Sequence, residues 1–151
     1  MAGDQQPDDL GLPAINLSGL AVESSARPIA FTIDNRYIKP LAVALLGIMD
    51  HSRLPRRVYV FHEGLHPLFR VMLRFWLRHS NIGLQIIKIR VNHKISALPH
   101  HFSRAILLRL LIASRIRESE FLYLDSDVII RDDLAVIDAI PLDDALIMAS
   151  P

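Results

Sequence analysis

The sequence predicts a three-layer α/β protein with a mainly parallel sheet. Short, wholly apolar runs alternate with longer segments of helical periodicity, in the order βαβαβαβ. Such runs are typical of strands buried on both faces of a parallel sheet, and the helices between them serve as right-handed crossovers. At 151 residues the chain has the length of one such domain.

The predicted domain begins at Pro28. Residues 1–27 are rich in Pro, Gly, Ser and Asp, which predicts a loosely ordered lead-in before a domain over residues 28–151. The apolar run 29–33 predicts the first strand, and the polar cluster 34–36 after it predicts a turn.

The first predicted helix starts near Pro40, which suits the first turn of a helix. Residues 41–49 are apolar almost all round, so we expect this helix to pack against the sheet and to be covered again on its other side. Residues 58–61 predict the second strand.

The second predicted helix begins near Pro67 and is amphipathic. Its apolar residues recur at i, i+4, i+7 and i+8, and its arginines recur at i, i+4 and i+8 on the other face, which we interpret as the solvent side. The apolar stripe is Leu68, Met72, Phe75 and Trp76, and the arginines are Arg70, Arg74 and Arg78.

Two further strands complete the predicted sheet. Residues 84–89 predict the third strand, and Ser103 can cap a helix that runs to about residue 114. Residues 121–124 predict a fourth buried strand. Beyond it, a short helix over residues 134–138 is expected, with Asp132 or Asp133 as its N-cap.

Composition excludes several classes of function. The chain has no cysteine, so it has no disulfide, no thiolate metal site and no cysteine nucleophile. No stretch of eighteen residues is free of polar interruption, which argues against a transmembrane segment. The N-terminus shows no secretion signal, so we expect a cytoplasmic protein, with peripheral association to the inner membrane as an option.

Charge is distributed unevenly. Residues 51–117 carry thirteen Lys or Arg and a single acidic residue, Glu63, whereas residues 118–151 carry nine Asp or Glu and a single basic residue, Arg131. This pattern fits a nucleic-acid stripe, a phosphate pocket facing a metal site, or two solvated faces. We expect no nucleic-acid binding, because the arginines lie on several elements without interleaved aromatic residues.

Asp125 and Asp127 directly follow the fourth predicted strand. In extended backbone, residues two apart point to the same side with Cα atoms about 6 to 7 Å apart, so both carboxylates can reach one cation while Ser126 points away. Paired carboxylates without nearby His or Cys make an oxygen site that suits Mg²⁺ or Mn²⁺. Ligands of open α/β sheets bind at the carboxyl ends of the strands. The alternative interpretation is a simple turn of aspartates after a strand.

A phosphohydrolase with an aspartate nucleophile also places Asp-x-Asp after an apolar strand. Such enzymes normally continue with Gly-Thr, in a turn that brings backbone N–H groups to the phosphate. Here the β-branched, apolar residues 128–130 follow. The sequence therefore disfavours a phosphatase.

Three ordered segments resemble glycosyltransferase family 8. Residues 121–130 (FLYLDSDVII) are similar to its DxD segment, and residues 31–37 (FTIDNRY) are similar to its first strand and D-x-N-Y turn. His101 and Ser103, followed by Arg109, are similar to its H-x-S…R helix start. One DxD motif is weakly specific, but three segments at consistent spacing are much stronger.

The resemblance, over about residues 28–151, implies a Rossmann-like GT-A fold, truncated here, and a set of site residues. Asp125 and Asp127 would ligate Mn²⁺ or Mg²⁺ on the diphosphate of a UDP-sugar, and Arg109 would be catalytic at the donor sugar. The other implied nucleotide-binding residues are Thr32, Ile33, Asp34 and Tyr37, with Tyr37 stacked on the uracil, together with His101, Ser103 and Ser126.

By this resemblance, the chain is part of a retaining hexosyltransferase that uses UDP-glucose or UDP-galactose. The acceptor would be a glycan or a lipid-linked saccharide, as in lipopolysaccharide synthesis. The family's downstream His ligand and acceptor-site strands are not found before Pro151, so we expect the isolated chain to be catalytically incomplete. The alternative is a non-catalytic relative that binds nucleotide-sugars or acts as an interaction module, with homo-oligomers formed through an exposed sheet edge.

Overall fold

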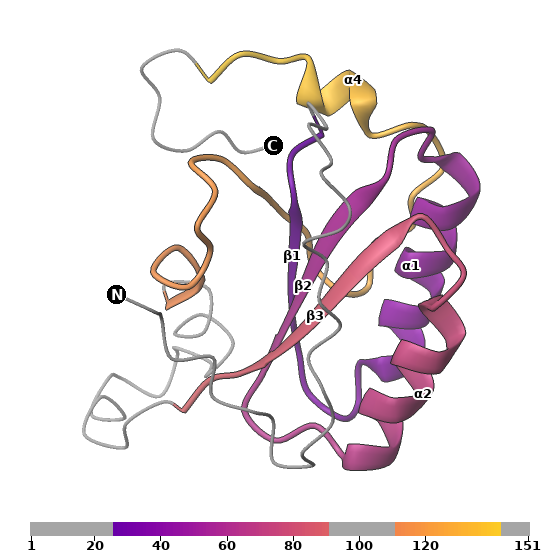
Figure 1. Cartoon of the computed structure of the whole chain (residues 1–151), viewed down its shortest axis with the longest axis vertical. Helices are drawn as coiled ribbons and strands as arrows, with labels where there is room; N and C mark the ends of the chain where they lie inside the picture. Colours follow the sequence, from indigo (N-terminus) through magenta and orange to yellow (C-terminus); the bar gives the residue numbers. More distant parts are fainter. Residues whose placement is uncertain (1–25, 91–110, 143–151) are drawn as a thin grey trace.

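The computed structural model describes residues 26–90 and 111–142. Within these ranges strands and helices alternate along the chain, as predicted. Figure 1 shows the strands in one twisted sheet with the two long helices on the same side of it. The elements are β1 (Ile29–Ile33), α1 (Ile38–His51), β2 (Arg56–His62), α2 (Pro67–Leu77), β3 (Ile82–Lys88), β4 (Leu122–Tyr123) and α4 (Ala135–Asp138).

The described sheet has four strands in the order β3-β2-β1-β4, and every pair is parallel. The predicted parallel α/β class is therefore confirmed. β1 lies inside the sheet, since Ile29 pairs with Val58 of β2 on one side and with Leu122 of β4 on the other. β4 is shorter than the predicted strand over residues 121–124, although Leu124 N still donates to Ala30 O at 3.0 Å.

Side chains of β2 alternate between two hydrophobic clusters, one on each face of the sheet. Val58 and Val60 pack in the cluster that α1 and α2 cover. Tyr59 and Phe61 face the other way and pack with Ile112. Burial on both faces explains why the strand sequences are apolar throughout. The helix predicted over residues 103–114 lies outside the described residues apart from its end, where Leu111 and Ile112 are helical and pack on this second face.

α2 turns a different face to the sheet from the one that its arginine periodicity indicates. Leu73 and Leu77 are buried in the core, and Arg70 is only 7% exposed. The prediction that Arg70 lies on the solvent side is therefore wrong. Both sides of this helix carry apolar residues, so periodicity alone allows two orientations, and packing of the leucines over the sheet selects one. The predicted apolar stripe instead lies at the surface: Leu68, Met72, Phe75 and Trp76.

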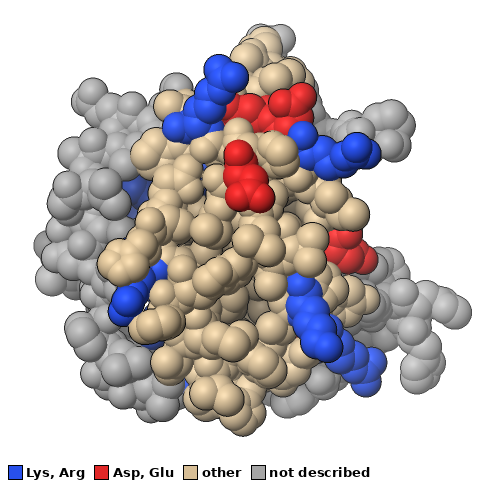
Figure 2. All heavy atoms as spheres, turned by 90° about the vertical axis from the view of Figure 1, so that its right-hand side faces the viewer, with Lys and Arg blue, Asp and Glu red and all other residues tan. Residues whose placement is uncertain are grey.

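The expectation that α1 is covered again on its outer side is also not met. Val43 and Leu46 of α1 are exposed, on the same side of the sheet as the exposed stripe of α2. We call this surface the outer helix face, made of Val43, Leu46, Leu68, Met72, Phe75 and Trp76. Figure 2 looks onto this side of the molecule, where uncharged side chains fill the centre of the view.

The chain that follows β4 crosses α1 at Gly47. A Cβ atom built on Gly47 would lie 2.6 Å from the carbonyl oxygen of Ile130 and 2.9 Å from its Cβ. No ordinary side chain fits this close approach, so position 47 requires glycine. Ile130 and Leu134 are buried in the same core cluster as α1, and they fix residues 128–134 against the helix layer.

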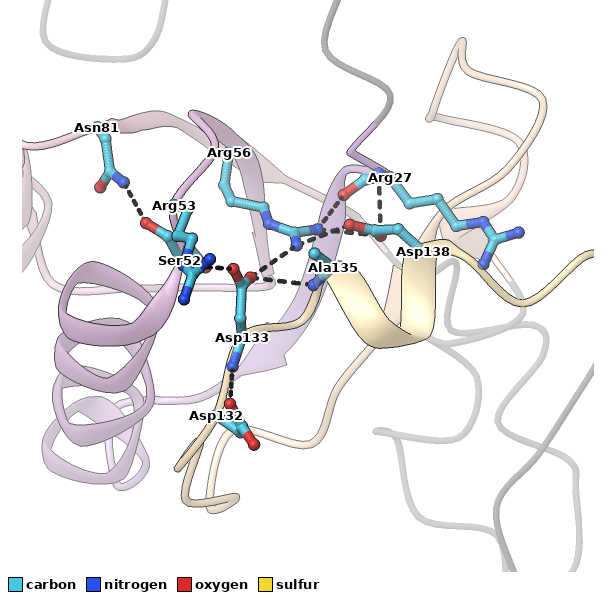
Figure 3. Close-up of polar contacts among 9 residues, drawn as sticks. All are labelled: Arg27, Ser52, Arg53, Arg56, Asn81, Asp132, Asp133, Ala135 and Asp138. Carbon is cyan, nitrogen blue, oxygen red and sulfur yellow. Dashed lines mark hydrogen bonds and ion pairs between the residues drawn. The ribbon is translucent and has the colours of Figure 1, made fainter.

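A buried polar cluster fixes α4 at the amino edge of the sheet, where β1 and β2 begin (Figure 3). Arg56, at the start of β2, is fully buried; its Nη1 donates to Asp138 Oδ1 at 3.0 Å and to the carbonyl oxygen of Arg27 at 3.3 Å. Arg56 Nη2 lies 2.7 Å from Asp138 Oδ2. Removing one member of a buried ion pair leaves an uncompensated charge, so this pair specifies where α4 docks.

The short helix predicted over residues 134–138 is confirmed, starting one residue later. The N-cap position belongs to Leu134, whose side chain makes no capping hydrogen bond. Asp133 supplies the bond expected of a cap, because its Oδ1 accepts from Ala135 N at 3.0 Å. Asp132 Oδ1 instead accepts from Asp133 N at 2.8 Å.

A second polar cluster lies on the sheet face opposite α1 and α2. Tyr59 OH donates to both carboxylate oxygens of Glu118, at 2.9 and 3.0 Å, and Arg57 forms an ion pair with the same carboxylate. Burial favours a higher pKa for Glu118, but hydrogen bonds from its own backbone, from Tyr59 and from Arg57 outweigh this and hold the pKa below its ordinary value. The cluster ties residue 118 to the middle of the sheet.

Gly47→Ala tests the close approach to Ile130. We expect the free energy of unfolding to fall by about 1 to 3 kcal/mol, even though alanine favours a helix by about 1 kcal/mol over glycine. Gly64→Ala is the matched control, since a Cβ at Gly64 meets nothing within 4 Å, and it should change stability by less than about 0.5 kcal/mol. Urea denaturation measures both. A stabilising Gly47→Ala would contradict the packing described.

Glu118→Gln tests the second cluster. Because the pKa of Glu118 is lowered in the folded state, its charged form stabilises fully above the ordinary carboxyl pKa, and this contribution is lost as pH falls through the folded value. We expect the variant to lose about 1 kcal/mol near neutral pH, a small figure because the carboxylate is partly exposed. In urea denaturation between pH 7 and 3, the free energy of unfolding of the variant should fall less steeply with decreasing pH than that of the parent. Glu63→Gln, outside the cluster, should keep the parent slope.

Candidate functional site

The carboxyl ends of β1 and β4 lie side by side and carry the acidic residues singled out in the sequence. Because Ala30 pairs with Tyr123 in a parallel register, Asp34 and Asp125 follow their strands at the same edge of the sheet. Both side chains are exposed. This is the edge at which open parallel sheets bind ligands.

Asp125 is positioned by a chain of hydroxyl groups. Tyr123 OH donates to Asp125 Oδ1 at 3.2 Å and lies 2.8 Å from Thr32 Oγ1. A phenol has one proton, and this one is donated to the carboxylate, so the Thr32 hydroxyl donates to Tyr123. Thr32 is buried in β1. Its fixed position anchors the hydrogen bonds that run from Thr32 through Tyr123 to Asp125.

The backbone after Asp125 forms a turn rather than the extended segment expected. Val128 N donates to the carbonyl oxygen of Asp125 at 3.3 Å, with Ser126 and Asp127 in the middle of the turn. Ser126 is buried, whereas Asp125 and Asp127 are exposed. The β4 ladder ends before these residues, so the chain is free to turn there. The structure thus presents two carboxylates to solvent on one short turn.

The loop after β1 is shaped by Asp34. Its Oδ1 accepts from Arg36 N at 2.7 Å, and its carbonyl oxygen accepts from Tyr37 N at 3.2 Å. Tyr37 then occupies the N-cap position of α1, with its ring exposed. An exposed ring beside this edge is available for stacking on a planar ligand, whereas Ile33 is buried at the end of β1.

Asn35 joins this loop to the loop after β2. Its Nδ2 donates to the carbonyl oxygen of Gly64 at 3.1 Å, and its Oδ1 accepts from His66 N at 3.0 Å. The sequence predicts that Asn35 lies in a turn, but it does not indicate these hydrogen-bond partners. Tyr123 was likewise read only as a strand residue, although its position two residues before Asp125 puts both on one side of a strand.

The described part of the chain offers two carboxylates for a cation. Within residues 26–90 and 111–142, no group of three or more His, Cys, Asp or Glu side chains could hold a metal ion. Asp125 and Asp127 remain a pair of oxygen donors on one turn, which suits Mg²⁺ or Mn²⁺ better than Zn²⁺. The residues present fit part of such a metal's ligand set. His101, Ser103 and Arg109 lie outside the described residues.

Comparisons with protein families and with individual proteins both show similarity to glycosyltransferases. The profile of Glycosyl transferase family 8 matches residues 28–151. Glycosyltransferase GlyB of Streptococcus pneumoniae serotype 4 is 27% identical over 123 residues, which are 79% of this chain and 30% of GlyB.

Solved structures show the same likeness. Galactosyltransferase LgtC, in complex with donor and acceptor sugar analogues, superposes with a TM-score of 0.66 and 25% identity over 76% of this chain and 43% of LgtC. Glycosyltransferase GlyE of Streptococcus pneumoniae TIGR4 superposes with a TM-score of 0.61 and 23% identity over 77% of this chain and 27% of GlyE, a likeness of fold alone. The chain thus spans less than half the length of each of these relatives.

The hydroxyl chain at this edge can be tested by a double-mutant cycle between Thr32→Val and Tyr123→Phe. We expect each single variant to lower the free energy of unfolding by about 1 kcal/mol, and the double variant to lose less than the sum by about 0.5 to 1 kcal/mol. Urea denaturation gives all four values. Strictly additive losses would show that the two hydroxyls do not interact.

Proposed function

The chain belongs to glycosyl transferase family 8, and we propose that it supplies donor and metal binding for a retaining hexosyltransferase. The donor is a UDP-sugar, UDP-glucose or UDP-galactose, and the acceptor is a glycan or a lipid-linked saccharide of the lipopolysaccharide type. The similar LgtC structure contains donor and acceptor sugar analogues, which supports this substrate class.

The observation that carries the proposal is the arrangement at the carboxyl edge of the sheet. Asp125 and Asp127 are exposed on one turn beside the loop that holds Asp34 and Tyr37. A diphosphate needs its negative charge neutralised, and carboxylates hold a diphosphate only through a cation between them. An exposed aromatic ring at the same edge matches the base of a nucleotide.

We assign the following roles within this proposal. Tyr37 stacks on the uracil, Asp34 accepts a hydrogen bond from the base edge, and Asp125 and Asp127 hold Mn²⁺ or Mg²⁺. Tyr123 keeps the Asp125 carboxylate oriented through its 3.2 Å hydrogen bond. The remaining proposed nucleotide-binding residues are Thr32, Ile33, Ser126, His101, Ser103 and Arg109, the last also reaching the donor sugar.

The chemical task is to stabilise charge on the departing UDP while positive charge develops at the anomeric carbon. A bound divalent cation supplies Lewis acidity at the diphosphate, and Arg109 adds a fixed positive charge. No side chain in the chain is assigned as a nucleophile. Retention then follows from attack of the acceptor hydroxyl on the face that UDP leaves, with its proton passing to the departing phosphate.

The second candidate is a non-catalytic relative that binds nucleotide-sugars or acts as an interaction module. Apolar side chains exposed in the segment after β4 favour it, since Ile129, Val136 and Ile140 offer contact area to another protein surface. UDP-hexose turnover in the presence of acceptor saccharides separates the two candidates, because the module binds UDP without releasing it from the sugar.

Metal-dependent UDP binding tests the proposed donor site. We expect calorimetric titration to show UDP binding that is at least about tenfold tighter with Mn²⁺ than with EDTA, since the cation bridges two sets of negative charge. The double variant Asp125→Asn with Asp127→Asn should abolish this difference.

Asp50→Asn is the matched control, because Asp50 is an exposed carboxylate on α1 away from this edge. It should bind UDP as the parent does. Binding that ignores Mn²⁺, or that survives the double substitution, would contradict the metal-site assignment.

A further inference from the structure

The Tyr37 side chain has little support of its own. Its residue is 43% exposed, so packing holds the ring only in part. Tyr37 occupies the N-cap position of α1, but its side chain makes no capping hydrogen bond there. The place of the ring therefore depends on the backbone that leads to it, residues 34–36. A group that fixes this short loop also fixes where the ring lies at the carboxyl edge of the sheet.

Asn35 ties this loop to the loop after β2 through both ends of its side-chain amide. Its Nδ2 donates to the carbonyl oxygen of Gly64 at 3.1 Å, and its Oδ1 accepts from His66 N at 3.0 Å. A flipped amide would face donor with donor and acceptor with acceptor, so only one orientation makes both bonds. An exposed residue is in this way held in a single arrangement.

The loop after β2 is a firm support for these bonds. His62, at the end of β2, is 2% exposed, and its Nδ1 accepts from Leu65 N at 2.8 Å. Leu65 is buried in the core cluster that α1 and α2 cover. His66 Nδ1 accepts from Leu68 N at 3.2 Å and so caps the start of α2. Asn35 therefore contacts a loop that is anchored in the core and in a helix.

Hydrogen bonds within the loop carry this constraint to the neighbours of Asn35. Arg36 N donates to Asp34 Oδ1 at 2.7 Å, and Tyr37 N donates to the carbonyl oxygen of Asp34 at 3.2 Å. Asn35 lies between these residues in the sequence, so a shift of its backbone moves the whole turn. Asp34 and Tyr37 thus share the support that Asn35 supplies.

We propose that Asn35 is a positioning residue for nucleotide binding, which holds Tyr37 and Asp34 ready for the base by fixing their loop to the loop after β2. The inference rests on the proposed function, because it concerns the same site, but it gives Asn35 no contact of its own with the ligand. A loop that is ordered in advance removes a cost that binding would otherwise carry. Loss of the bridge should therefore weaken binding of ligands that contain a base and spare the metal and diphosphate contacts.

Calorimetric titration of Asn35→Ala with Mn²⁺ present tests this. We expect UDP to bind about threefold to tenfold more weakly than to the parent, because the loop and the ring must then be ordered on binding. Inorganic pyrophosphate, which has no base, should bind within about twofold of the parent value. The whole chain is titrated in aqueous buffer, and no helix within residues 26–90 and 111–142 is long and apolar enough to cross a bilayer.

Asn81→Ala is the matched control. Asn81 Nδ2 likewise donates to a backbone carbonyl oxygen, that of Ser52, at 3.0 Å, but it does so before β3 at the opposite edge of the sheet. The control removes a hydrogen bond of the same kind from the same type of side chain. It should bind UDP and pyrophosphate as the parent does.

A double-mutant cycle shows whether Asn35 acts through Tyr37. With Tyr37→Ala there is no ring to position, so adding Asn35→Ala should weaken UDP binding by less than about twofold. A merely structural role would give the same loss in both backgrounds. Amide hydrogen exchange without ligand measures the bridge directly: in Asn35→Ala, the amides of Arg36 and Tyr37 should exchange at least about tenfold faster, with the strands unchanged.

Several results would overturn the inference while leaving the donor site in place. They are parent-like UDP binding by Asn35→Ala, equal losses for UDP and pyrophosphate, equal losses with and without the Tyr37 ring, and unchanged exchange at Arg36 and Tyr37. A parent chain that does not bind UDP would instead overturn the proposed donor site, and this inference with it.

Discussion

The parallel pairing of β1 with β4 creates the candidate site. Thr32 and Tyr123, 91 positions apart along the chain, are brought within 2.8 Å, and the Tyr123 hydroxyl then orients Asp125. Without this pairing, the turn that carries the carboxylates and the loop that carries Asp34 would have no fixed relation. The ladder itself is short, with two residue pairs, so it depends on contacts made on either side of it. One of these is the close approach at Gly47.

Another contact that holds the chain after β4 in place is the Arg56–Asp138 pair, buried beneath α4. It lies at the amino edge of the sheet, opposite the candidate site. The segment between the two edges is therefore held at both ends, by the ladder at one and by the ion pair at the other. Burying a charge is costly unless it is paired, so the pair favours a single docking position for α4 over alternatives that leave Arg56 uncompensated.

The sequence predicted the elements well where periodicity and burial agree. Uninterrupted apolar runs identified β1 and β2, and Pro67 marked the start of α2. The family resemblance is confirmed by the match over residues 28–151. The orientation of α2 could not be predicted, because both of its sides are apolar and only packing decides between them. The Arg56–Asp138 pair and the Asn35 bridge join distant segments through single side chains, which leave no periodic signal in the sequence.

The strand order has a consequence for the sequence of folding events. β1, β2 and β3 are joined by α1 and α2, so each of these neighbours follows the last along the chain and their pairing closes only moderate loops. β4 joins β1 from the far side after a much longer excursion, and closing a longer loop costs more entropy. A folding unit of three strands and two helices is thus favoured to form first, and the acidic turn then attaches to an edge that already exists. The acidic turn and the loop that carries Asp34 are therefore brought together last, after the rest of the sheet is in place.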